Sequence, residues 1–181
     1  MIREIEFRGY CKALKKWIYG NLVISEPQEL HAGDMTALIG LQYDIFPREK
    51  ALGHSSVIPG TVGQYTGLID KNGKRIYEGD TFEKTTHPRI YHRTVDADGK
   101  YNGETYDIHP GVHIKYAVAW NPQSCSFDAQ IIHVDPQGVK VGSTFIPHNE
   151  IAIGDMYSLD SFFNGQKRAE IIGNIHEGGA E

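Results

Sequence analysis

The sequence of 181 residues contains only two cysteines, Cys11 and Cys125. Two thiols cannot form a four-cysteine zinc site, although they could join histidines as metal ligands. They are also isolated from each other, as is typical of proteins in a reducing compartment. The cysteine content therefore predicts a cytoplasmic location and excludes a small disulfide-stapled scaffold.

Long apolar runs are also absent. No window approaches the ~18 apolar residues that a membrane-spanning helix needs. The opening residues, Met1 to Phe7, alternate charged and apolar side chains and lack the continuous apolar stretch of a signal peptide. We therefore expect no association with a membrane and no secretion. Within this alternation, Ile5 and Phe7 fit the buried face of a strand.

Familiar catalytic motifs are missing as well: there is no glycine-rich phosphate loop, no GxGxxG and no HExxH. Among nine histidines, His109 and His113 have an even spacing, and Asp107 and Asp135 could join them as ligands. A zinc site needs three or four ligands that converge to about 2.0–2.3 Å from the ion. Pro110-Gly111 is expected to bend the chain between the two histidines. We therefore expect no metal and no cofactor, and a small metal-dependent hydrolase is kept as an alternative.

Basic charge is scarce too, with 18 Lys and Arg against 23 Asp and Glu and a net charge of −5. Residues 71–93 carry six basic and three acidic groups, and residues 94–181 carry five and twelve. A chain with this balance is a weak candidate for nucleic-acid binding, although a local patch can suffice.

The basic segment nevertheless contains an aromatic residue between basic ones, a combination that can bind single-stranded nucleic acid. A solvated, mobile loop is the alternative interpretation. The candidate binding residues are Lys84, Arg89, Tyr91 and Arg93.

Glycine and proline, by contrast, are frequent: twenty and eight residues spread along the chain predict many turns and short strands. His113 to Trp120 alternates apolar and polar side chains more cleanly than any other segment, and Phe127 to Val134 is predicted to be its partner strand. The fold class is therefore mainly β, with a minor α component.

The most informative stretch runs from Gly63 to Asp80, and is called the central segment below. Asn72-Gly73 predicts a two-residue type I′ hairpin turn, because both residue types tolerate positive φ. Glu78-Gly79-Asp80 then predicts a tight turn that opens a new strand. Glu78 and Asp80 could act as an acid–base pair or bind a cation, but we favour a turn in which Asp80 accepts backbone N–H bonds.

Three parts of the chain resemble one known family. Arg3-Glu4-Ile5-Glu6-Phe7-Arg8 is similar to its opening Arg-Glu-Ile-Lys-Phe-Arg, with Glu6 in place of lysine. Pro59, Thr61 and the run from Gly63 to Leu68 match its central Pro-x-Thr-x-Gly-Gln-Tyr-Thr-Gly-Leu pattern. The segment Glu170 to Glu177 is similar to its closing motif Glu-Val-Ile-Gly-Asn-Ile-Tyr-Glu, with His176 at the tyrosine position. The order and spacing of these parts resemble the YopX family of phage and prophage proteins.

This resemblance implies an all-β N-terminal region over residues 1–60 and a C-terminal SH3-like or pseudo-β-barrel domain with short helices over residues 61–181. A long loop over residues 84–111 is expected within the second part. The family brings no established biochemical activity. The positions that we expect to carry its signature, in a structural rather than a catalytic role, are Gly63, Gln64, Tyr65, Thr66, Gly67, Leu68, Asp70, Asn72, Gly73, Ile76, Tyr77, Glu78, Gly79, Asp80, Gly173 and Asn174.

The resemblance implies an accessory protein of a phage or prophage, which we expect in the cytoplasm of a bacterial host. It favours a non-enzymatic binding module whose partner is a protein or a nucleic acid. A metal-dependent hydrolase and a self-assembling structural protein, the latter a homo-oligomer, are the alternatives.

Overall fold

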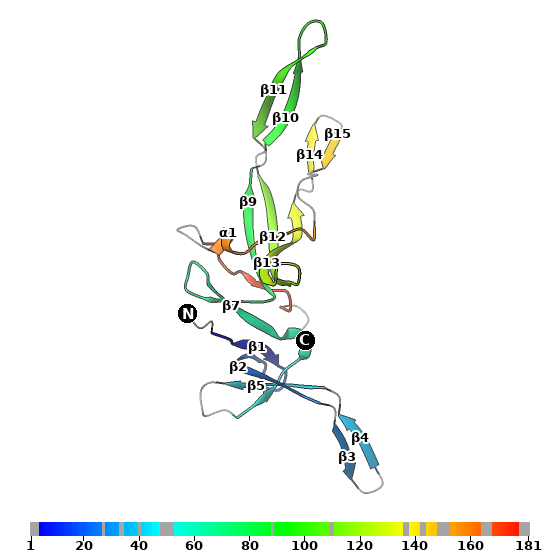
Figure 1. The fold of residues 1–181 in the computed structure, drawn as a ribbon, viewed down its shortest axis with the longest axis vertical. Coiled ribbons are helices and arrows are strands. Elements are labelled where there is room, and N and C mark those ends of the chain that lie inside the picture. Colours follow the sequence, from blue (N-terminus) through cyan, green and yellow to red (C-terminus); the bar gives the residue numbers. More distant parts are fainter. Residues whose placement is uncertain are drawn as a thin grey trace.

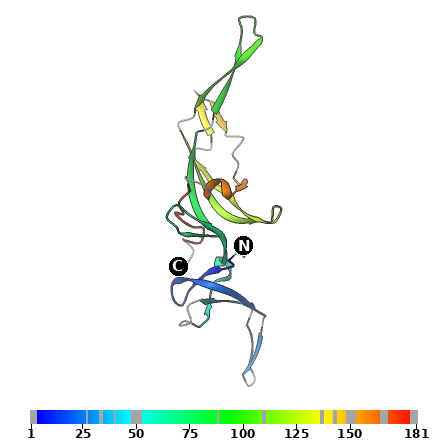
Figure 2. The same cartoon turned by 60° about the vertical axis from the view of Figure 1, so that its left-hand side comes forward.

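The structure of the protein is a computed structural model. It describes residues 4–26, 28–32, 35–39, 41–47, 53–87, 89–108, 111–135, 138–141, 144–147, 153–163 and 168–177. Figures 1 and 2 show an elongated molecule in which two sheets form the middle and two-stranded arms extend from it.

The first sheet contains six strands in the order β6-β5-β2-β1-β7-β8. Its long ladders are antiparallel, with β1 between β2 and β7. The strands are β1 (Phe7–Cys11), β2 (Lys16–Ser25), β5 (Gln42–Pro47), β6 (Ser55–Ser56), β7 (Gly63–Ile69) and β8 (Arg75–Tyr77). A short 3₁₀ helix, η1 (Pro59–Thr61), leads from β6 into β7.

The second sheet contains five strands in the order β16-β13-β12-β9-β17. The strands are β9 (Asp80–Thr86), β12 (Val112–Asn121), β13 (Ser126–Asp135), β16 (Met156–Ser158) and β17 (Gly173–Asn174). A single-turn helix, α1 (Asp160–Phe163), follows β16. The two long strands predicted from the alternating pattern are thereby confirmed as β12 and β13.

Three two-stranded arms complete the described part of the chain. They are β3 (Gln28–Ala32) with β4 (Met35–Ile39), β10 (Arg89–Val95) with β11 (Tyr101–Ile108), and β14 (Gly138–Val141) with β15 (Thr144–Pro147). In the sequence, the first arm connects β2 to β5 where their pairing ends, at Ser25 and Gln42. The second arm connects β9 to β12 in the same way, at Thr86 and Val112. Figure 1 shows these two arms at opposite ends of the molecule.

The larger apolar core lies on the second sheet and centres on Phe82, which is completely buried. Its ring stacks on Tyr116 at a centroid distance of 5.0 Å and meets the edge of Phe163 at 4.9 Å. Helix α1 supplies Phe163 and Phe162 to this core, so one helical turn closes the face of the sheet. Aromatic pairs of this kind add about 0.5–1.5 kcal/mol each beyond the burial of their area. A smaller core in the first sheet contains Cys11 and Ile45.

The prediction of a mainly-β fold is confirmed, but the described strands form open sheets and no closed barrel. The prediction of a long loop over residues 84–111 is wrong. Lys84 to Thr86 complete β9, and most of the remainder forms the β10–β11 hairpin, because the turn at Asp96–Gly99 folds the two halves onto each other. The division into residues 1–60 and 61–181 stays a prediction, although β1 and β7, from either side of residue 60, are neighbours in one sheet.

The hairpin predicted at Asn72-Gly73 is present, but its turn type is different. Of the two central residues of this turn, Gly73 has a positive φ, of +80°, and Asn72 does not. A type I′ turn needs positive φ at both, so the turn is not type I′. The Asp70 carboxylate accepts the backbone N–H groups of Asn72 and Lys74, both at 2.8 Å. These bonds favour right-handed geometry at Lys71 and Asn72 and leave Gly73 alone in the left-handed region.

This geometry predicts unequal effects of two neighbouring substitutions. Gly73→Ala should lower the free energy of unfolding by about 1–2 kcal/mol, the cost of a side chain in the left-handed region. Asn72→Ala should lower it by less than about 0.5 kcal/mol, since Asn72 loses only an exposed hydrogen bond to Glu170. Urea unfolding measures both values, and equal losses would support the type I′ turn instead.

No helix in the described ranges is both long and apolar enough to cross a membrane. The expectation of short helices agrees with α1 and η1.

Candidate functional site

The central segment carries the chain from the first sheet into the second. Strand β8 ends at Tyr77, and β9 begins at Asp80. Gly79 between them has a φ of +83°, donates its N–H to the Val118 carbonyl at 2.8 Å and accepts the Ile175 N–H at 2.9 Å. A left-handed residue held by strand β12 and by the C-terminal segment fixes where the two sheets meet.

A buried ion pair spans this junction. Arg8 of β1 lies 2.7 Å from Asp80, and the side chains are 5% and 1% exposed. Arg8 also donates to the Glu78 carbonyl at 3.1 Å. Asp80 accepts the Tyr77 N–H at 2.9 Å and lies 3.5 Å from the Asn174 amide. The pair therefore joins the first strand of the chain to β9 and to the closing motif.

A second polar group lies beside it. The Tyr77 hydroxyl donates to Glu6, and Arg75 contacts the other oxygen of the same carboxylate at 2.9 Å. The Arg8 guanidinium lies over the rings of Trp17 and Tyr77, at 4.8 and 4.9 Å from their centroids. Because a guanidinium over an aromatic face is stabilised by the ring quadrupole, the aromatic rings help to hold Arg8 in place. Glu6, Arg8, Arg75, Tyr77 and Asp80 are called the junction cluster below.

Burial and charge shift several pKa values around the cluster. Burial raises the pKa of Asp80, and the nearby Arg8 only partly opposes this effect. Burial also raises the pKa of Tyr19, and burial together with the bond to Glu6 raises that of Tyr77. Burial and the positive charge of Arg8 lower the pKa of His176. At neutral pH the two tyrosines are therefore protonated donors and His176 is uncharged.

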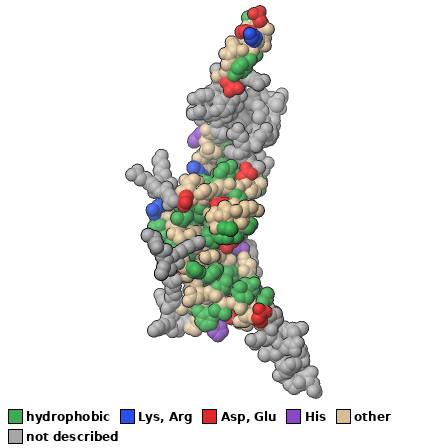
Figure 3. Space-filling model, in the orientation of Figure 1, with side chains coloured by type: hydrophobic (Ala, Val, Ile, Leu, Met, Phe, Trp, Pro, Cys, Tyr) green, Lys and Arg blue, Asp and Glu red, His purple; other side chains and the backbone are tan. Residues whose placement is uncertain are grey.

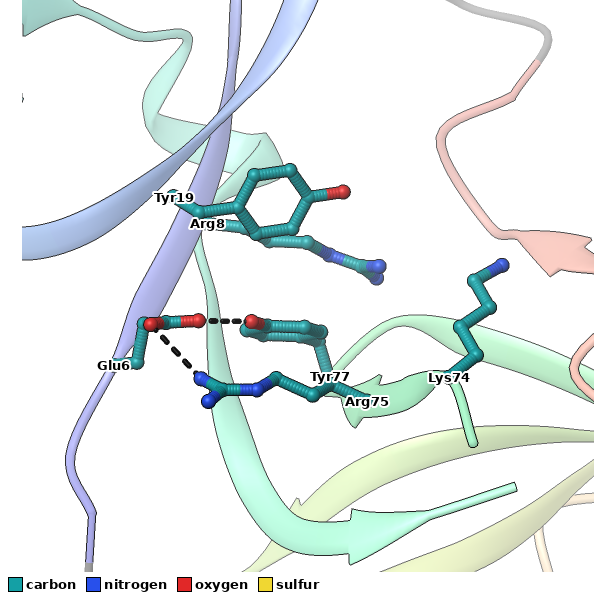
Figure 4. A pocket seen from close by; sticks show the side chains of 6 residues that line it. All are labelled: Glu6, Arg8, Tyr19, Lys74, Arg75 and Tyr77. Carbon is teal, nitrogen blue, oxygen red and sulfur yellow. Dashed lines mark hydrogen bonds and ion pairs between the residues drawn. The ribbon is translucent and has the colours of Figure 1, made fainter. Parts of the chain in front are cut away.

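A pocket with a volume of about 410 Å³ opens at the junction cluster. It is lined by Glu6, Arg8, Tyr19, Lys74, Arg75 and Tyr77. Figure 4 shows that the Tyr19 hydroxyl and the Arg8 guanidinium point toward the side on which the Lys74 amine lies. The volume falls within the range of about 300–1,000 Å³ that is usual for small-molecule sites.

The structure separates Glu78 from Asp80 rather than placing them as an acid–base pair. Asp80 is buried against Arg8, whereas Glu78 is partly exposed and contributes its backbone carbonyl. Asp80 accepts a backbone N–H, as the turn interpretation predicted. Two positions of the closing motif pair with the start of β9, where the central segment ends, since Asn174 lies opposite Asp80 and Gly173 opposite Thr81.

The four candidate binding residues are not brought together in one sheet. Lys84 lies in β9, and its amine sits 4.9 Å from the centroid of the Phe162 ring. Arg89, Tyr91 and Arg93 occupy every second position of β10 in the arm. The basic segment seen in the sequence is thus divided between the β7–β8 turn, the second sheet and the arm.

The histidine–carboxylate hypothesis stays a prediction. His113 lies opposite Asp135, and its Nδ1 is 3.0 Å from the Thr85 hydroxyl oxygen. Asp107 lies in β11, and His109 lies outside the described residues. In the ranges that the structure describes, no three His, Cys, Asp or Glu side chains gather as a metal site would require.

The sequence predicted no role for Glu6, Arg8, Tyr19 or Arg75. A signal was present, since Glu6 and Arg8 belong to the opening motif that resembles the family. Alternating charges at a chain start usually mark a solvated face. The burial of Glu6 and Arg8 could therefore not be inferred without knowing that they contact Tyr77 and Asp80.

The fold and the site define a class: a mainly-β protein in which an arginine–aspartate pair joins two open antiparallel sheets that also carry two-stranded arms. Comparison with family models then identifies the family. The model of the YopX protein family matches residues 6–179, nearly the whole chain, so the protein belongs to the YopX family. A search of curated proteins returns no match.

Proposed function

We propose that the protein is a non-enzymatic binding protein, encoded by a phage or prophage and acting in the host cytoplasm, and that its partner is another protein. The single observation that carries the proposal is the arm formed by β10 and β11. This arm leaves the second sheet, ends in a tip with exposed apolar side chains and has no net positive charge.

The arm is an extension of a ladder in the sheet. Strands β9 and β12 pair as far as Thr86 and Val112, and the chain between them forms the hairpin. Figures 1 and 2 both show this hairpin extending beyond the sheets. A two-stranded hairpin alone is at best marginally stable in water, and its unpaired edges can receive a further strand. A partner protein that packs on the arm or pairs with its edge would stabilise it.

The tip of the arm combines a rigid turn with apolar side chains. Asp96 accepts the N–H groups of Asp98 and Lys100, the same arrangement that Asp70 makes in the β7–β8 turn. Val95 and Tyr101 lie opposite each other next to this turn and are 58% and 56% exposed. Apolar side chains held at the end of an arm favour contact with another protein over contact with water.

The charge of the arm favours a protein over a nucleic acid. Between Arg89 and Ile108 the chain has three basic and four acidic residues, which gives a net charge of −1. Affinity for nucleic acid depends on neutralising several phosphates with basic side chains. On the face shown in Figure 3, basic side chains are few and scattered over the described surface.

Matched arm deletions test the proposal. Because Thr86 lies opposite Val112, residues 87–111 can be replaced by an Asn-Gly turn. Because Ser25 lies opposite Gln42, residues 26–41 can be replaced in the same way, which gives a control of similar kind. Tagged forms of the full chain and of both variants are incubated with lysate of phage-infected bacteria, with and without nuclease treatment, and captured proteins are quantified by mass spectrometry.

The full chain and the control should capture the same partner, and removal of residues 87–111 should reduce its recovery at least about tenfold, the effect of losing one or two contacts at the centre of an interface. Val95→Asp with Tyr101→Ser should reproduce that loss without shortening the chain. Capture that disappears after nuclease treatment would contradict the proposal and favour nucleic acid. Recovery of this chain alone as its own partner would favour the self-assembling structural protein.

A further inference from the structure

We propose that the pocket at the junction cluster binds a carboxylate that carries a single negative charge, together with the apolar or aromatic group attached to it. The inference is independent of the arm and rests on which polar groups of the pocket already have partners.

The acceptors of the pocket are engaged. One oxygen of Glu6 accepts the Tyr77 hydroxyl and the other contacts Arg75. One oxygen of Asp80, which does not line the pocket, contacts Arg8, and the other accepts the Tyr77 N–H. Both carboxylates are buried. A ligand that offers hydrogen-bond donors would therefore meet acceptors that are already occupied.

The donors, in contrast, are not all used. Arg8 is 4% exposed, and its buried Nε–H has no acceptor in the part of the chain that the structure describes. Among the described residues, no acidic side chain pairs with the Lys74 amine and no group is hydrogen-bonded to the Tyr19 hydroxyl. A buried donor without an acceptor is destabilising, and most buried donors in native proteins have one. The pocket is therefore suited to a ligand that accepts hydrogen bonds.

The charges around the pocket favour a ligand with one negative charge. Arg8 is paired with Asp80, and Arg75 is shared between Glu6 and Glu4, from which it is 2.9 and 3.2 Å away. Lys74 is the lining cation that pairs with no described acidic residue, so the negative charge of a ligand is expected at its amine. The Glu4–Arg75–Glu6 group has one more carboxylate than cations, which disfavours a second negative charge. A carboxylate supplies one negative charge and two acceptor oxygens, whereas a phosphate dianion would bring a second charge close to Glu6.

The pocket has room for more than a carboxylate, with a volume of about 410 Å³. Its aromatic wall is formed by Tyr19, which is 45% exposed, and by Tyr77, whose ring centroid lies 5.5 Å from that of Tyr19. The exposed Tyr19 ring can pack against an apolar or aromatic group next to the carboxylate. Such a ligand is either a small organic acid or the C-terminal residue of a polypeptide.

Calorimetric titration of the full chain tests this site with four probes: benzoate, benzamide, inorganic phosphate, and a short peptide with a C-terminal phenylalanine in its acid and amide forms. Benzoate or the peptide acid should bind, while benzamide and the peptide amide should not. A peptide acid that binds at least tenfold more tightly than benzoate assigns the site to a polypeptide C-terminus. Equal or tighter binding of benzoate assigns it to a small organic acid.

The matched variants are Lys74→Met and Lys71→Met. Both lysines are exposed and close together in the β7–β8 turn, but Lys71 pairs with Glu170 and does not line the pocket. Lys74→Met should weaken binding about tenfold or more, as expected for the loss of one charge-assisted bond, and Lys71→Met should leave it unchanged. The proposal is overturned if neither carboxylate binds, if the two variants behave alike, or if phosphate binds as tightly as the carboxylates.

Discussion

Replacing Arg8 by methionine should lower the free energy of unfolding by about 3–5 kcal/mol, because it leaves the buried Asp80 carboxylate without its ionic partner. Asp80 is 1% exposed and lies 2.7 Å from Arg8 in the folded protein. Methionine fills part of the volume of the arginine side chain, but it lacks the guanidinium that lies over Trp17 and Tyr77 and donates to the Glu78 carbonyl. The pH dependence and the double variant described below isolate the contribution of the charge.

The effect of Arg8→Met should depend on pH in a defined direction. Burial raises the pKa of Asp80 in the folded protein above that of an aspartate in the unfolded chain. Between these two pKa values the folded protein binds more protons, so the contribution of Asp80 to the free energy of unfolding decreases as pH rises. Without Arg8 this pKa rises further and the interval extends to higher pH. The deficit of the variant should therefore be largest near neutral pH and become smaller as pH falls toward about 4, the ordinary pKa of aspartate.

Urea unfolding at several pH values measures this deficit. Arg8→Met combined with Asp80→Asn should recover part of the loss, because the double variant leaves no buried charge. Lys71→Met is the control, since it breaks only an exposed pair with Glu170 and should leave the free energy of unfolding almost unchanged. An Arg8→Met variant as stable as this control would show that the ion pair does not hold the sheets together.

Gly63→Ala should be the other strongly destabilising substitution, with a loss of about 1–3 kcal/mol from overpacking. A Cβ at this position would lie 2.5 Å from the Glu78 carbonyl oxygen. That oxygen accepts a hydrogen bond from Arg8, and Arg8 lies opposite Gly63 in the β1–β7 ladder. Because the obstructing atom belongs to the backbone, relief requires a shift of the chain at the junction of the sheets.

Gly60→Ala is the matched control for Gly63→Ala. Gly60 lies three residues earlier, in η1, and a Cβ there would have no atom within 4 Å. Its effect on the unfolding free energy should stay within about 0.5 kcal/mol. Thermal and urea unfolding of the two variants compare them directly, and equal stabilities would mean that the close approach of β7 to Glu78 does not constrain the fold.

Local patterns in the sequence were sufficient to predict several elements. Strand β12 follows a clean alternation, and its buried residues Ile114, Tyr116 and Val118 form the face that packs on the core. Its partner β13 was likewise predicted, over Phe127 to Val134. These elements depend on neighbours in sequence and on one buried face, and both are visible in the residue pattern.

The β10–β11 hairpin could also have been found from the sequence. Asp96-Ala97-Asp98-Gly99-Lys100 repeats the pattern of Asp70-Lys71-Asn72-Gly73-Lys74, and both segments form the same aspartate-stabilised turn. The polar composition around the second turn concealed the strands. In the first turn, the flanking apolar residues made the hairpin easy to recognise, although the turn type was assigned incorrectly.

The junction cluster was beyond sequence reasoning for a physical reason. The alternation at the chain start predicted that Ile5 would be buried, yet Ile5 is 58% exposed, and Glu6 and Arg8 are buried instead. Two charged side chains can occupy the inner face only because Tyr77, Arg75 and Asp80, about seventy residues later in the chain, satisfy them. Pairing over this separation leaves no periodic signal in a single sequence.

Amide hydrogen exchange on the full chain, with and without its captured partner protein, tests the proposed function most directly. Partner binding should slow exchange in β10 and β11, over Arg89–Val95 and Tyr101–Ile108, and leave exchange in β3 and β4 unchanged. Slowed exchange in other parts of the chain with no change in β10 and β11 would contradict the proposal that this arm is the binding element.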